Sequence, residues 1–459
     1  MAKAFTLTAD WLLSQLDKIG ASSFCVGLSG GLDSVVLLHM CKCLFLRGQL
    51  KSLRAVHINH GLSENAEQWA AHCQSLGEQW NIPVSVFGLQ VKSSGQGLED
   101  AARAARYEIF GNELQDNECL LLAHHAQDQA ETLLYRLFRG AGVEGLAAMP
   151  VSRSVGLGTL FRPLLQVSRQ AIEQYAVQHE LVWVDDESND LVDFDRNYLR
   201  HNVLPVVLQR WPKAISSLTK TVKHCTAAAE ILHDVAIQDM QQIVQEPPFL
   251  TGMNGFPIFL PDFLQLSEAR QRNVLRHWLQ ELNWPKPSTE HLAQITQQLS
   301  ARSDASPQVC WANVMVRRYK QWLFALPSQL SHIPVVAQVL NITTSDQYNL
   351  SGNGLLMLSS INNNEPRIQV GSASQSLHII YREQWSAEKK FAVANRSGKK
   401  TLKRWLQEFN VVPWLRDRVP LIVNEDGHLV AAAGFWVVAE FAAQKDEQGW
   451  KIEWQPCLR

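Results

Sequence analysis

The sequence predicts an α/β protein: an N-terminal Rossmann-like parallel sheet, a mainly α middle domain and a small α/β C-terminal domain. Between residues 23 and 122, short apolar β-type runs alternate with amphipathic helical stretches, which is typical of βαβ units. A Gly-Gly turn follows the first of these runs directly. At roughly 150 residues per domain, a length of 459 residues indicates about three structural units.

Four apolar runs predict the strands of the first sheet. They cover residues 23–28, 53–58, 84–87 and 119–123, and a helical pattern separates each pair. In a parallel sheet of this kind the ligand lies beyond the carboxyl ends of the strands. The segments that follow the strands therefore matter most for function, and they are 29–34, 59–61 and 124–131.

The rest of the chain is divided by composition and periodicity. The first domain covers residues 1–212 and includes a helix that begins near Ser168. Helical patterns at 213–245, 267–282 and 288–299 predict a mainly helical domain at 213–330. A Ser-, Asn- and Gln-rich stretch predicts a linker at 331–365, and β-type runs at 377–381 and 420–423 place the C-terminal α/β domain at 366–459.

The composition excludes several protein classes. A hydrophobic fraction of 46% and a charged fraction of 19% indicate a chain that buries a sizeable core, not a disordered or fibrous one. The apolar stretch at 429–439 falls short of the ~20 residues that span a bilayer, so we expect no membrane span. The N-terminus lacks the apolar core of a signal peptide and the eight cysteines are scattered, which predicts a reducing, cytoplasmic setting.

The segment after the first strand has the features of an anion cradle. Its residues are Ser29, Gly30, Gly31, Leu32, Asp33 and Ser34, and they open a helix. The glycines let the backbone approach phosphate oxygens, the two hydroxyls can donate hydrogen bonds, and a helix N-terminus favours negative charge. A lysine does not follow, so this is not a Walker loop.

Asp33 is the informative residue of this loop. A carboxylate beside a phosphate cradle is repulsive unless a divalent cation lies between them, which implies Mg²⁺. The alternative is a structural Gly-Gly turn capped by serine and aspartate.

The full hexapeptide after a first strand resembles the loop of the pyrophosphate-loop ATPases. These enzymes cleave ATP between the α and β phosphates, adenylate a substrate and release pyrophosphate. Further segments resemble one branch, the tRNA(Ile)-lysidine synthases. In chain order they are 57–62, Glu99 with Arg103, Arg106 and Tyr107, then 124–132, 139–146, 183–189, 195–200 and 413–417. One departure is Gln127, where many relatives carry an acidic or small residue.

The resemblance implies a reaction and its partners. ATP adenylates O2 of the wobble cytidine in the CAU anticodon of tRNA(Ile), and the ε-amine of free L-lysine then attacks C2 and expels AMP. The products are lysidine, AMP and pyrophosphate. The chain is thereby identified as an AMP-forming carbon-nitrogen ligase that uses ATP and Mg²⁺.

Asp128 and Glu131 are expected to act beside Asp33. They are three residues apart on a predicted helix and so share a face that points back toward the strand ends. Asp33 and Asp128 are the predicted metal ligands, and one of the carboxylates could take a proton from the lysine amine, whose free pKa is about 10.4. The alternative is that Asp128 and Glu131 only complement the helix dipole.

His57, His60 and His124 lie at strand ends and are predicted to form polar walls of the nucleotide pocket, with His125. A zinc site is the alternative, but no cysteine accompanies them in metal-ligand spacing. Cys73 and Cys119 are the cysteine candidates for a sulfur-transfer reaction, and the chain has no Cys-x-x-Cys motif.

Basic residues in two regions are the predicted tRNA contacts. In the first domain they are Arg103, Arg106, Arg196, Asn197 and Arg200, because guanidinium groups bind phosphate and stack on bases. In the C-terminal domain, residues 396–418 hold seven Lys and Arg against two Asp and Glu, with Trp405 and Trp414 interleaved. There the predicted contacts are Lys399, Lys400, Lys403 and Arg404. Surface arginines paired with local acids, and a solvated basic helix, are the alternatives.

Other functional classes stay open at this point. Within the same fold they are tRNA thiolation and amide-forming ligation of a small molecule, which needs a source of ammonia. A non-catalytic tRNA-binding protein is a third class, against which the intact phosphate loop and Asp128 argue. The sequence leaves the lysine-binding residues and the oligomeric state undetermined.

Overall fold

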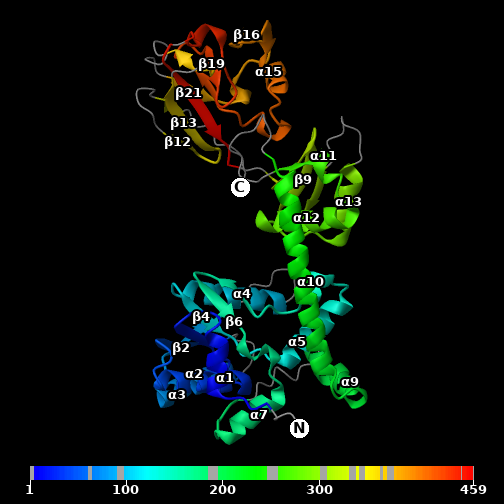
Figure 1. Cartoon of the computed structure of the whole chain (residues 1–459). Helices are drawn as coiled ribbons and strands as arrows, with labels where there is room; N and C mark the ends of the chain where they lie inside the picture. Colours follow the sequence, from blue (N-terminus) through cyan, green and yellow to red (C-terminus); the bar gives the residue numbers. More distant parts are fainter. Residues whose placement is uncertain are drawn as a thin grey trace. The chain divides into compact units, whose positions relative to one another are not determined.

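The computed structural model describes residues 5–59, 65–89, 98–184, 195–245, 257–299, 308–329, 338–340, 347–361, 365–369, 377–445 and 447–457. The chain divides into two compact units, Met1–Ile231 and Leu232–Arg459. Figure 1 labels the helices and strands of both units. Among the described residues, no helix has the length and apolar character needed to cross a membrane.

A six-stranded sheet forms the centre of the first unit. Its order is β3-β2-β1-β4-β6-β5, and all neighbours pair in parallel except β5 and β6, which form an antiparallel hairpin. The strands are β1 (Ser23–Gly27), β2 (Ser52–Asn59), β3 (Val84–Gly88), β4 (Glu118–Leu121), β5 (Ser152–Val155) and β6 (Gly158–Phe161). The predicted parallel sheet is thus confirmed, with the hairpin as an addition.

Both faces of this sheet are covered by helices (Figure 1). Along β1 the side chains alternate, since Phe24 and Val26 pack into one core and Cys25 into the other. The first core contains residues of α1 (Ala9–Leu16), α2 (Leu32–Leu46), α3 (Ala66–Trp80) and α7 (Arg169–Gln178), and the second contains residues of α4 (Leu98–Glu113). A strand buried on both faces reads as a continuous apolar run, as observed for β1.

The remaining helices of the first unit follow β4 and β6. They are α5 (Ala126–Phe138), α6 (Val143–Leu146), a 3-10 turn (Pro163–Gln166), α8 (Asp195–Tyr198), a π-helical turn (Leu199–Val203) and α9 (Leu204–Arg210). Helix α7 begins directly after Ser168, as the sequence predicts, and the Ser168 hydroxyl caps it. The long helix α10 (Ala214–Ile243) crosses the division between the two units.

The middle part of the chain contains the predicted helices and also a sheet. The helices are α11 (Leu260–Phe263), α12 (Glu268–Glu281) and α13 (Thr289–Leu299). The antiparallel sheet has the order β7-β10-β9-β8, with β7 (Ile258–Phe259), β8 (Gln308–Trp311), β9 (Val314–Tyr319) and β10 (Trp322–Pro327). The mainly helical prediction did not include this sheet, although β8, β9 and β10 are short apolar runs joined by two-residue turns. The strands pack with α12 and α13 in one core.

The described residues of the C-terminal part form antiparallel sheets, the short helix α15 (Leu402–Glu408) and 3-10 turns at Arg382–Gln384, Pro413–Leu415 and Ala439–Phe441. One sheet has the order β11-β15-β18-β19-β20 and another β12-β13-β21-β14, and β16 pairs with β17. The strands are β11 (Gln338–Leu340), β12 (Gln347–Leu350), β13 (Gly354–Ile361), β14 (Ile368–Gln369), β15 (Leu377–Ile380), β16 (Lys390–Ala392), β17 (Lys399–Thr401), β18 (Leu421–Val423), β19 (Leu429–Ala432), β20 (Trp436–Val437) and β21 (Gly449–Gln455).

The structure has strands within the range 331–365, where the sequence predicts a linker. Strands β11, β12 and β13 lie within that range, and β13 pairs with β21 from Leu355 to Ile361. The Ser- and Asn-rich composition favours a loop locally, but Leu356 and Leu358 are buried through pairing with a strand almost a hundred residues away. The other domain boundaries stay predictions.

Candidate active site

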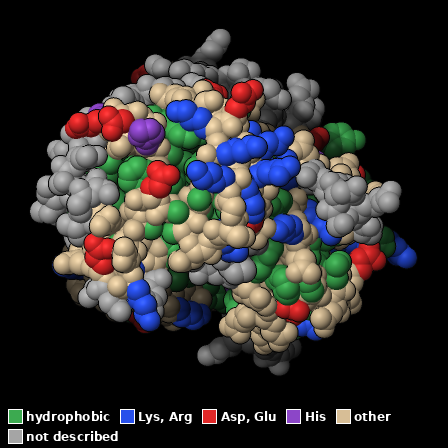
Figure 2. Space-filling view, turned by 90° about the horizontal axis from the view of Figure 1, so that it is seen from above, with side chains coloured by type: hydrophobic (Ala, Val, Ile, Leu, Met, Phe, Trp, Pro, Cys, Tyr) green, Lys and Arg blue, Asp and Glu red, His purple; other side chains and the backbone are tan. Residues whose placement is uncertain are grey.

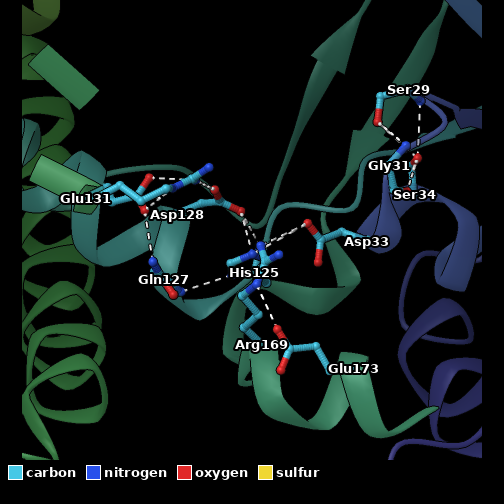
Figure 3. A network of polar contacts seen from close by, with 11 residues as sticks. Ser29, Gly31, Asp33, Ser34, His125, Gln127, Asp128, Glu131, Arg169 and Glu173 are labelled. Carbon is cyan, nitrogen blue, oxygen red and sulfur yellow. Dashed lines mark hydrogen bonds and ion pairs between the residues drawn. The ribbon is translucent and has the colours of Figure 1, made fainter. Parts of the chain in front are cut away.

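The phosphate loop joins β1 to α2. Gly30 adopts a φ of +87°, a left-handed conformation that glycine takes without strain. The hydroxyls of Ser29 and Ser34 lie 3.0 Å apart, Ser34 Oγ donates to the carbonyl of Gly31 at 3.0 Å, and the Gly31 N–H donates to Ser29 Oγ at 3.3 Å (Figure 3). These bonds close the turn at the N-terminus of α2, where backbone N–H groups and the helix dipole favour an anion. The side chain of Leu32 is buried in the core beneath the loop.

Asp33, in the first turn of α2, faces residues from two other helices. Its Oδ2 lies 3.6 Å from Nε2 of His125 and 3.9 Å from Nη1 of Arg169. Its Oδ1 is buried and has no hydrogen-bond partner among the described residues. Burial raises the pKa of Asp33 above its usual value, and the charge of Asp128 adds to this while His125 opposes it. The surroundings of this carboxylate therefore disfavour its charge, and a perturbed carboxylate in a cavity is typical of functional sites.

Asp128 and Glu131 lie on α5 and are both held by Arg200. Arg200 Nε donates to Glu131 Oε1 at 2.7 Å, and its Nη2 donates to Glu131 Oε2 at 2.8 Å and to Asp128 Oδ1 at 2.9 Å. The other oxygen of Asp128 accepts the backbone N–H of His125 at 2.8 Å and so caps the helix. Burial opposes the charge of Asp128, but His125 and Arg200 outweigh it and lower the pKa. Glu131 is 1% exposed, and the guanidinium compensates its buried charge.

The predicted histidines His57 and His124 lie on different sides of the sheet. His57 donates from Nδ1 to the carbonyl of Leu28 at 2.9 Å and is buried beside Cys73, and burial lowers its pKa. Val56 and Ile58, the neighbours of His57 along β2, line the cavity. Because successive side chains of a strand point to opposite faces of the sheet, His57 points away from the cavity. His60, the other predicted residue of this segment, lies outside the described residues. His124 lies on the cavity side of the sheet.

A cavity of about 390 Å³ lies at the carboxyl ends of β1 and β4. Its polar lining is formed by Ser29, Asp33, Ser34, Arg106, His124, Asp128, Glu131, Arg196, Asn197 and Arg200. Residues more than 160 positions apart in the sequence thus meet in one space. The predicted residues Gly30, Gly31, Leu32, His57 and Arg103 do not line it. The cavity therefore contains the phosphate loop and guanidinium groups, which can bind anions, and carboxylates, which can bind a cation or accept a proton.

Arginines surround Tyr107 next to this cavity. The guanidinium carbons of Arg103, Arg106 and Arg153 lie 5.4, 5.7 and 4.4 Å from its ring centroid, and Arg162 Nη2 donates to its hydroxyl at 3.0 Å. Burial alone would raise the pKa of Tyr107, but the cations outweigh it and lower the pKa. Among the described residues no carboxylate forms an ion pair with Arg103 or Arg106. Of the four arginines around Tyr107 only Arg106 lines the cavity, where Arg196 and Arg200 complete a cationic wall.

No separate role was predicted from the sequence for three residues that the structure places at the ligand edge of the sheet. His125 bridges Asp33 and Asp128, Arg169 approaches Asp33 while bonding to Glu173 at 3.0 Å, and Arg162 contacts both Tyr107 and His124 (Figure 3 draws the first two). Arg162 follows β6 directly, so recognition of β6 as a strand would have placed it at the ligand edge of the sheet.

The predicted basic patch of the C-terminal part lies in the second unit. Lys399, Lys403 and Arg404 are exposed, whereas Lys400 pairs with Glu408. Figure 2 shows a face of the molecule on which Lys and Arg side chains gather. Trp405 and Trp414, which are interleaved in the sequence, are buried core residues, with 0% and 9% exposure. Aromatic stacking on RNA is therefore not offered by these two rings.

The two candidate cysteines are buried in the core. Burial raises the pKa of the Cys73 thiol to about 12, and the same cause raises that of Cys119 to about 12. A thiol with such a pKa stays protonated near neutral pH and is a poor nucleophile. This disfavours sulfur transfer through either residue.

Comparison with known proteins agrees with this arrangement. Models of three families match the chain: the PP-loop domain at residues 6–207, the TilS substrate binding domain at 260–324 and the TilS substrate C-terminal domain at 378–454. A U34-tRNA thiolase from Methanococcus maripaludis has a TM-score of 0.37 and 15% identity, over 47% of this chain and 79% of that chain, and this likeness carries no argument about activity.

Curated relatives match almost the whole chain. A tRNA(Ile)-lysidine synthase of Coxiella burnetii is 37% identical over 440 residues, covering 95% of this chain and 94% of the relative. One of Pseudomonas fluorescens is 38% identical over 439 residues, covering 95% and 94%. With the phosphate loop, the two carboxylates of α5 and the arginine wall in one cavity, the chain belongs to the tRNA(Ile)-lysidine synthase family.

Proposed function

We propose that this protein ligates free L-lysine to C2 of the wobble cytidine in the CAU anticodon of tRNA(Ile), with ATP as the energy source. O2 of the cytidine attacks the α-phosphorus of ATP and pyrophosphate leaves. The lysine ε-amine then attacks C2, O2 departs with AMP, and the amine loses a proton. The observation that carries this proposal is the single cavity that joins the phosphate loop to Asp128, Glu131 and a cationic wall.

The phosphate loop is the proposed site of the ATP phosphates. Backbone N–H groups at the start of α2 and the hydroxyls of Ser29 and Ser34 are the donors at that place. Donors aimed at developing negative charge stabilise the transition state of phosphoryl attack without reorganisation. The loop is closed by its own hydrogen bonds, so its turn is formed before ATP binds. The Ser34 hydroxyl, which donates to the Gly31 carbonyl, would exchange that acceptor for a phosphate oxygen.

Asp33 and Asp128 are the residues that would hold Mg²⁺. Mg²⁺ is usually bound by one or two carboxylates together with substrate phosphates and waters, not by a dedicated protein cage. One observation fits this: Oδ1 of Asp33 is buried and has no partner among the described residues. When bound, the ion would neutralise phosphate charge beside the carboxylates.

Asp128 and Glu131 are the proposed acceptors for the proton of lysine. The ε-amine attacks only when neutral, and its free pKa of about 10.4 means that a positioned base is needed near neutral pH. Both carboxylates line the cavity, and Arg200 holds them in one geometry. A carboxylate pair also attracts the ammonium form of lysine into the site.

Arg103, Arg106, Arg196 and Asn197 are the proposed contacts to the tRNA near the anticodon. Arg106 is partly buried, its buried Nε has no partner among the described residues, and burial together with Arg103 and Arg196 lowers its pKa. Such a cation gains free energy when a phosphate binds, because the anion compensates its charge. Lys399, Lys400, Lys403 and Arg404 are proposed to bind tRNA phosphates elsewhere on the same substrate.

A pyrophosphate-release assay tests the proposal. With purified tRNA(Ile) and ATP we expect pyrophosphate release without lysine, and AMP release and lysidine only after lysine is added. A matched tRNA with uridine in place of the wobble cytidine is the control and should release no pyrophosphate. Equal release with the uridine tRNA, or a product that requires a sulfur donor or ammonia instead of lysine, would overturn it.

A further inference from the structure

Arg162 contacts His124 from behind the cavity. Its side chain is almost fully buried, with 2% exposure, and every end of the guanidinium is engaged. Nε donates to Nδ1 of His124 at 3.2 Å, Nη1 to the carbonyl of Pro150 at 2.9 Å and Nη2 to the hydroxyl of Tyr107 at 3.0 Å. Arg162 itself does not line the cavity, so it can act on a ligand there only through its neighbours.

This contact decides which nitrogen of His124 carries the proton. A guanidinium has only donors, so Nδ1 of His124 must accept and holds a lone pair. A neutral imidazole then carries its proton on Nε2. Burial lowers the pKa of His124 to about 3, with Arg162 and Arg106 adding to the effect against the opposing charge of Asp128, so the ring is neutral near physiological pH.

The protonated edge of His124 is the one available to the cavity. The two ring nitrogens point away from each other, and Arg162 occupies the Nδ1 side while His124 lines the cavity with Ser29 and Asp33. Its neighbour His125 follows the same pattern. The backbone N–H of Gln127 donates to Nδ1 of His125 at 3.2 Å, and Nε2 of His125 faces Asp33 and Asp128.

We propose that Arg162 is a positioning residue that fixes His124 in its Nε2–H tautomer, so that His124 offers one hydrogen-bond donor to an acceptor oxygen of the substrates in the cavity. This role rests on the proposed function for the identity of those substrates. The acceptor oxygen belongs either to the α-phosphate of ATP or to O2 of the cytidine. The two are joined in the adenylation step, where negative charge develops on the phosphate oxygens and a fixed donor is worth most.

Tautomer measurement in the whole protein tests the first half of the proposal without any substrate. In protein labelled with ¹⁵N-histidine, long-range ¹H–¹⁵N spectra should show His124 protonated at Nε2. Arg162→Lys keeps a donor-only group and should preserve this tautomer, whereas Arg162→Gln offers both a donor and an acceptor and should populate both forms. Arg153→Gln is the control, because Arg153 also lies over Tyr107, at 4.4 Å, and should leave the tautomer unchanged.

Kinetics test the second half. Arg162→Gln should lower kcat for pyrophosphate release by about 10–100-fold, the usual scale for a residue that orients a functional imidazole, and Arg162→Lys should recover most of that loss. If Arg162→Gln lowers only kcat, the hydrogen bond from His124 is made in the transition state of adenylation. If the variant instead raises only the KM for ATP, the hydrogen bond is made to the phosphate of bound ATP. The double variant with His124→Gln should be no slower than His124→Gln alone, because Arg162 acts through His124.

A second pair of variants keeps the proposal testable if Arg162→Gln unfolds in a thermal melt. Gln at position 124 places an amide donor near the Nε2 position and Asn near the Nδ1 position, so His124→Gln should retain more activity than His124→Asn. The proposal is overturned if Arg162→Gln keeps a pure Nε2–H tautomer, if Arg162→Lys is as slow as Arg162→Gln, or if His124→Asn equals His124→Gln. The tautomer spectra need no substrate, so they would still test the role of Arg162 if the protein proved to lack lysidine activity.

Discussion

Asp33 and Asp128 face the same atom: Oδ2 of each carboxylate lies 3.6 Å from Nε2 of His125. The two aspartates come from the first turns of α2 and α5, which follow the neighbouring strands β1 and β4. In a parallel sheet, neighbouring strands end at the same edge, so their following helices bring these first turns together. The charge of each aspartate is thus linked to the other through one imidazole.

Asp33→Asn should abolish adenylation and leave tRNA binding nearly intact. The amide keeps the size of the side chain but removes the charge needed to hold a cation at the phosphates, and we expect at least a ~10²-fold loss of pyrophosphate release. Asp10→Asn is a matched control, because Asp10 forms a surface pair with Arg47 and should not affect the rate. Near-normal release by Asp33→Asn would remove the proposed metal role.

Asp128→Asn should be severely impaired, whereas Cys73→Ser and Cys119→Ser should be nearly silent in turnover. Asp128 lines the cavity, while both thiols are buried with pKa values raised to about 12. The pair of outcomes separates amine transfer from sulfur transfer, and single-turnover modification of tRNA(Ile) measures it. A folded cysteine variant that fails to turn over would contradict the lysidine mechanism.

Replacing Lys399, Lys400, Lys403 and Arg404 by alanine should weaken binding of all tRNAs about equally. Each lost phosphate contact should remove roughly 0.7–0.9 from the slope of log K against log salt. Filter-binding titrations at several salt concentrations measure the slope, and modification at saturating tRNA should survive. We expect the smallest single effect from Lys400, which is paired with Glu408.

Lys51→Ala is a suitable control for the salt titration, because Lys51 precedes β2 at the amino ends of the strands, away from the cavity. An unchanged slope in the quadruple variant would assign the four residues to a solvated face. The RNA-binding role would then rest on Arg103, Arg106, Arg196 and Asn197, since Arg200 is engaged by Asp128 and Glu131.

The pair of Arg54 and Glu118 should make the first unit sensitive to acid. Arg54 donates from Nε and Nη2 to the two carboxylate oxygens at 2.7 Å, and Glu118 is 5% exposed. Burial opposes the charge of Glu118, but the bonds from Arg54 and from the N–H of Gln115 outweigh it and lower the pKa. A carboxylate with a lowered folded pKa stabilises the fold above its unfolded pKa of about 4.3, and this stabilisation is lost as pH falls through the folded value.

Glu118→Gln should therefore lower the free energy of unfolding by about 1–3 kcal/mol at pH 7. The difference from the wild type should shrink as the pH drops below about 4.3, because the wild-type carboxyl then becomes protonated as well. Urea titrations at a series of pH values measure this. A difference that stays constant down to pH ~2 would contradict the ionic role of the pair.

The parallel sheet and its functional edge could be predicted from the sequence because their signals are local. Each strand is a short apolar run, and the Gly-Gly turn with Ser29, Asp33 and Ser34 follows the first of them directly. Helix periodicity likewise predicted α10, α12 and α13 within a few residues. The family resemblance also depends on contiguous segments, so it too can be read along the chain.

Other features were decided by contacts between distant segments. Strand β7 pairs with β10, β11 with β15, and β13 with β21, and each of these pairs joins segments far apart in the sequence, which local patterns do not predict. The same holds inside the site: alternation along β2 turns His57 behind the loop, and Arg200 reaches Glu131 across 69 positions. Arg162 selects the protonated nitrogen of His124 from 38 positions away. Residue types and their order are written in the sequence, but the direction of a side chain and the partner of a charge depend on which strands and helices pack together.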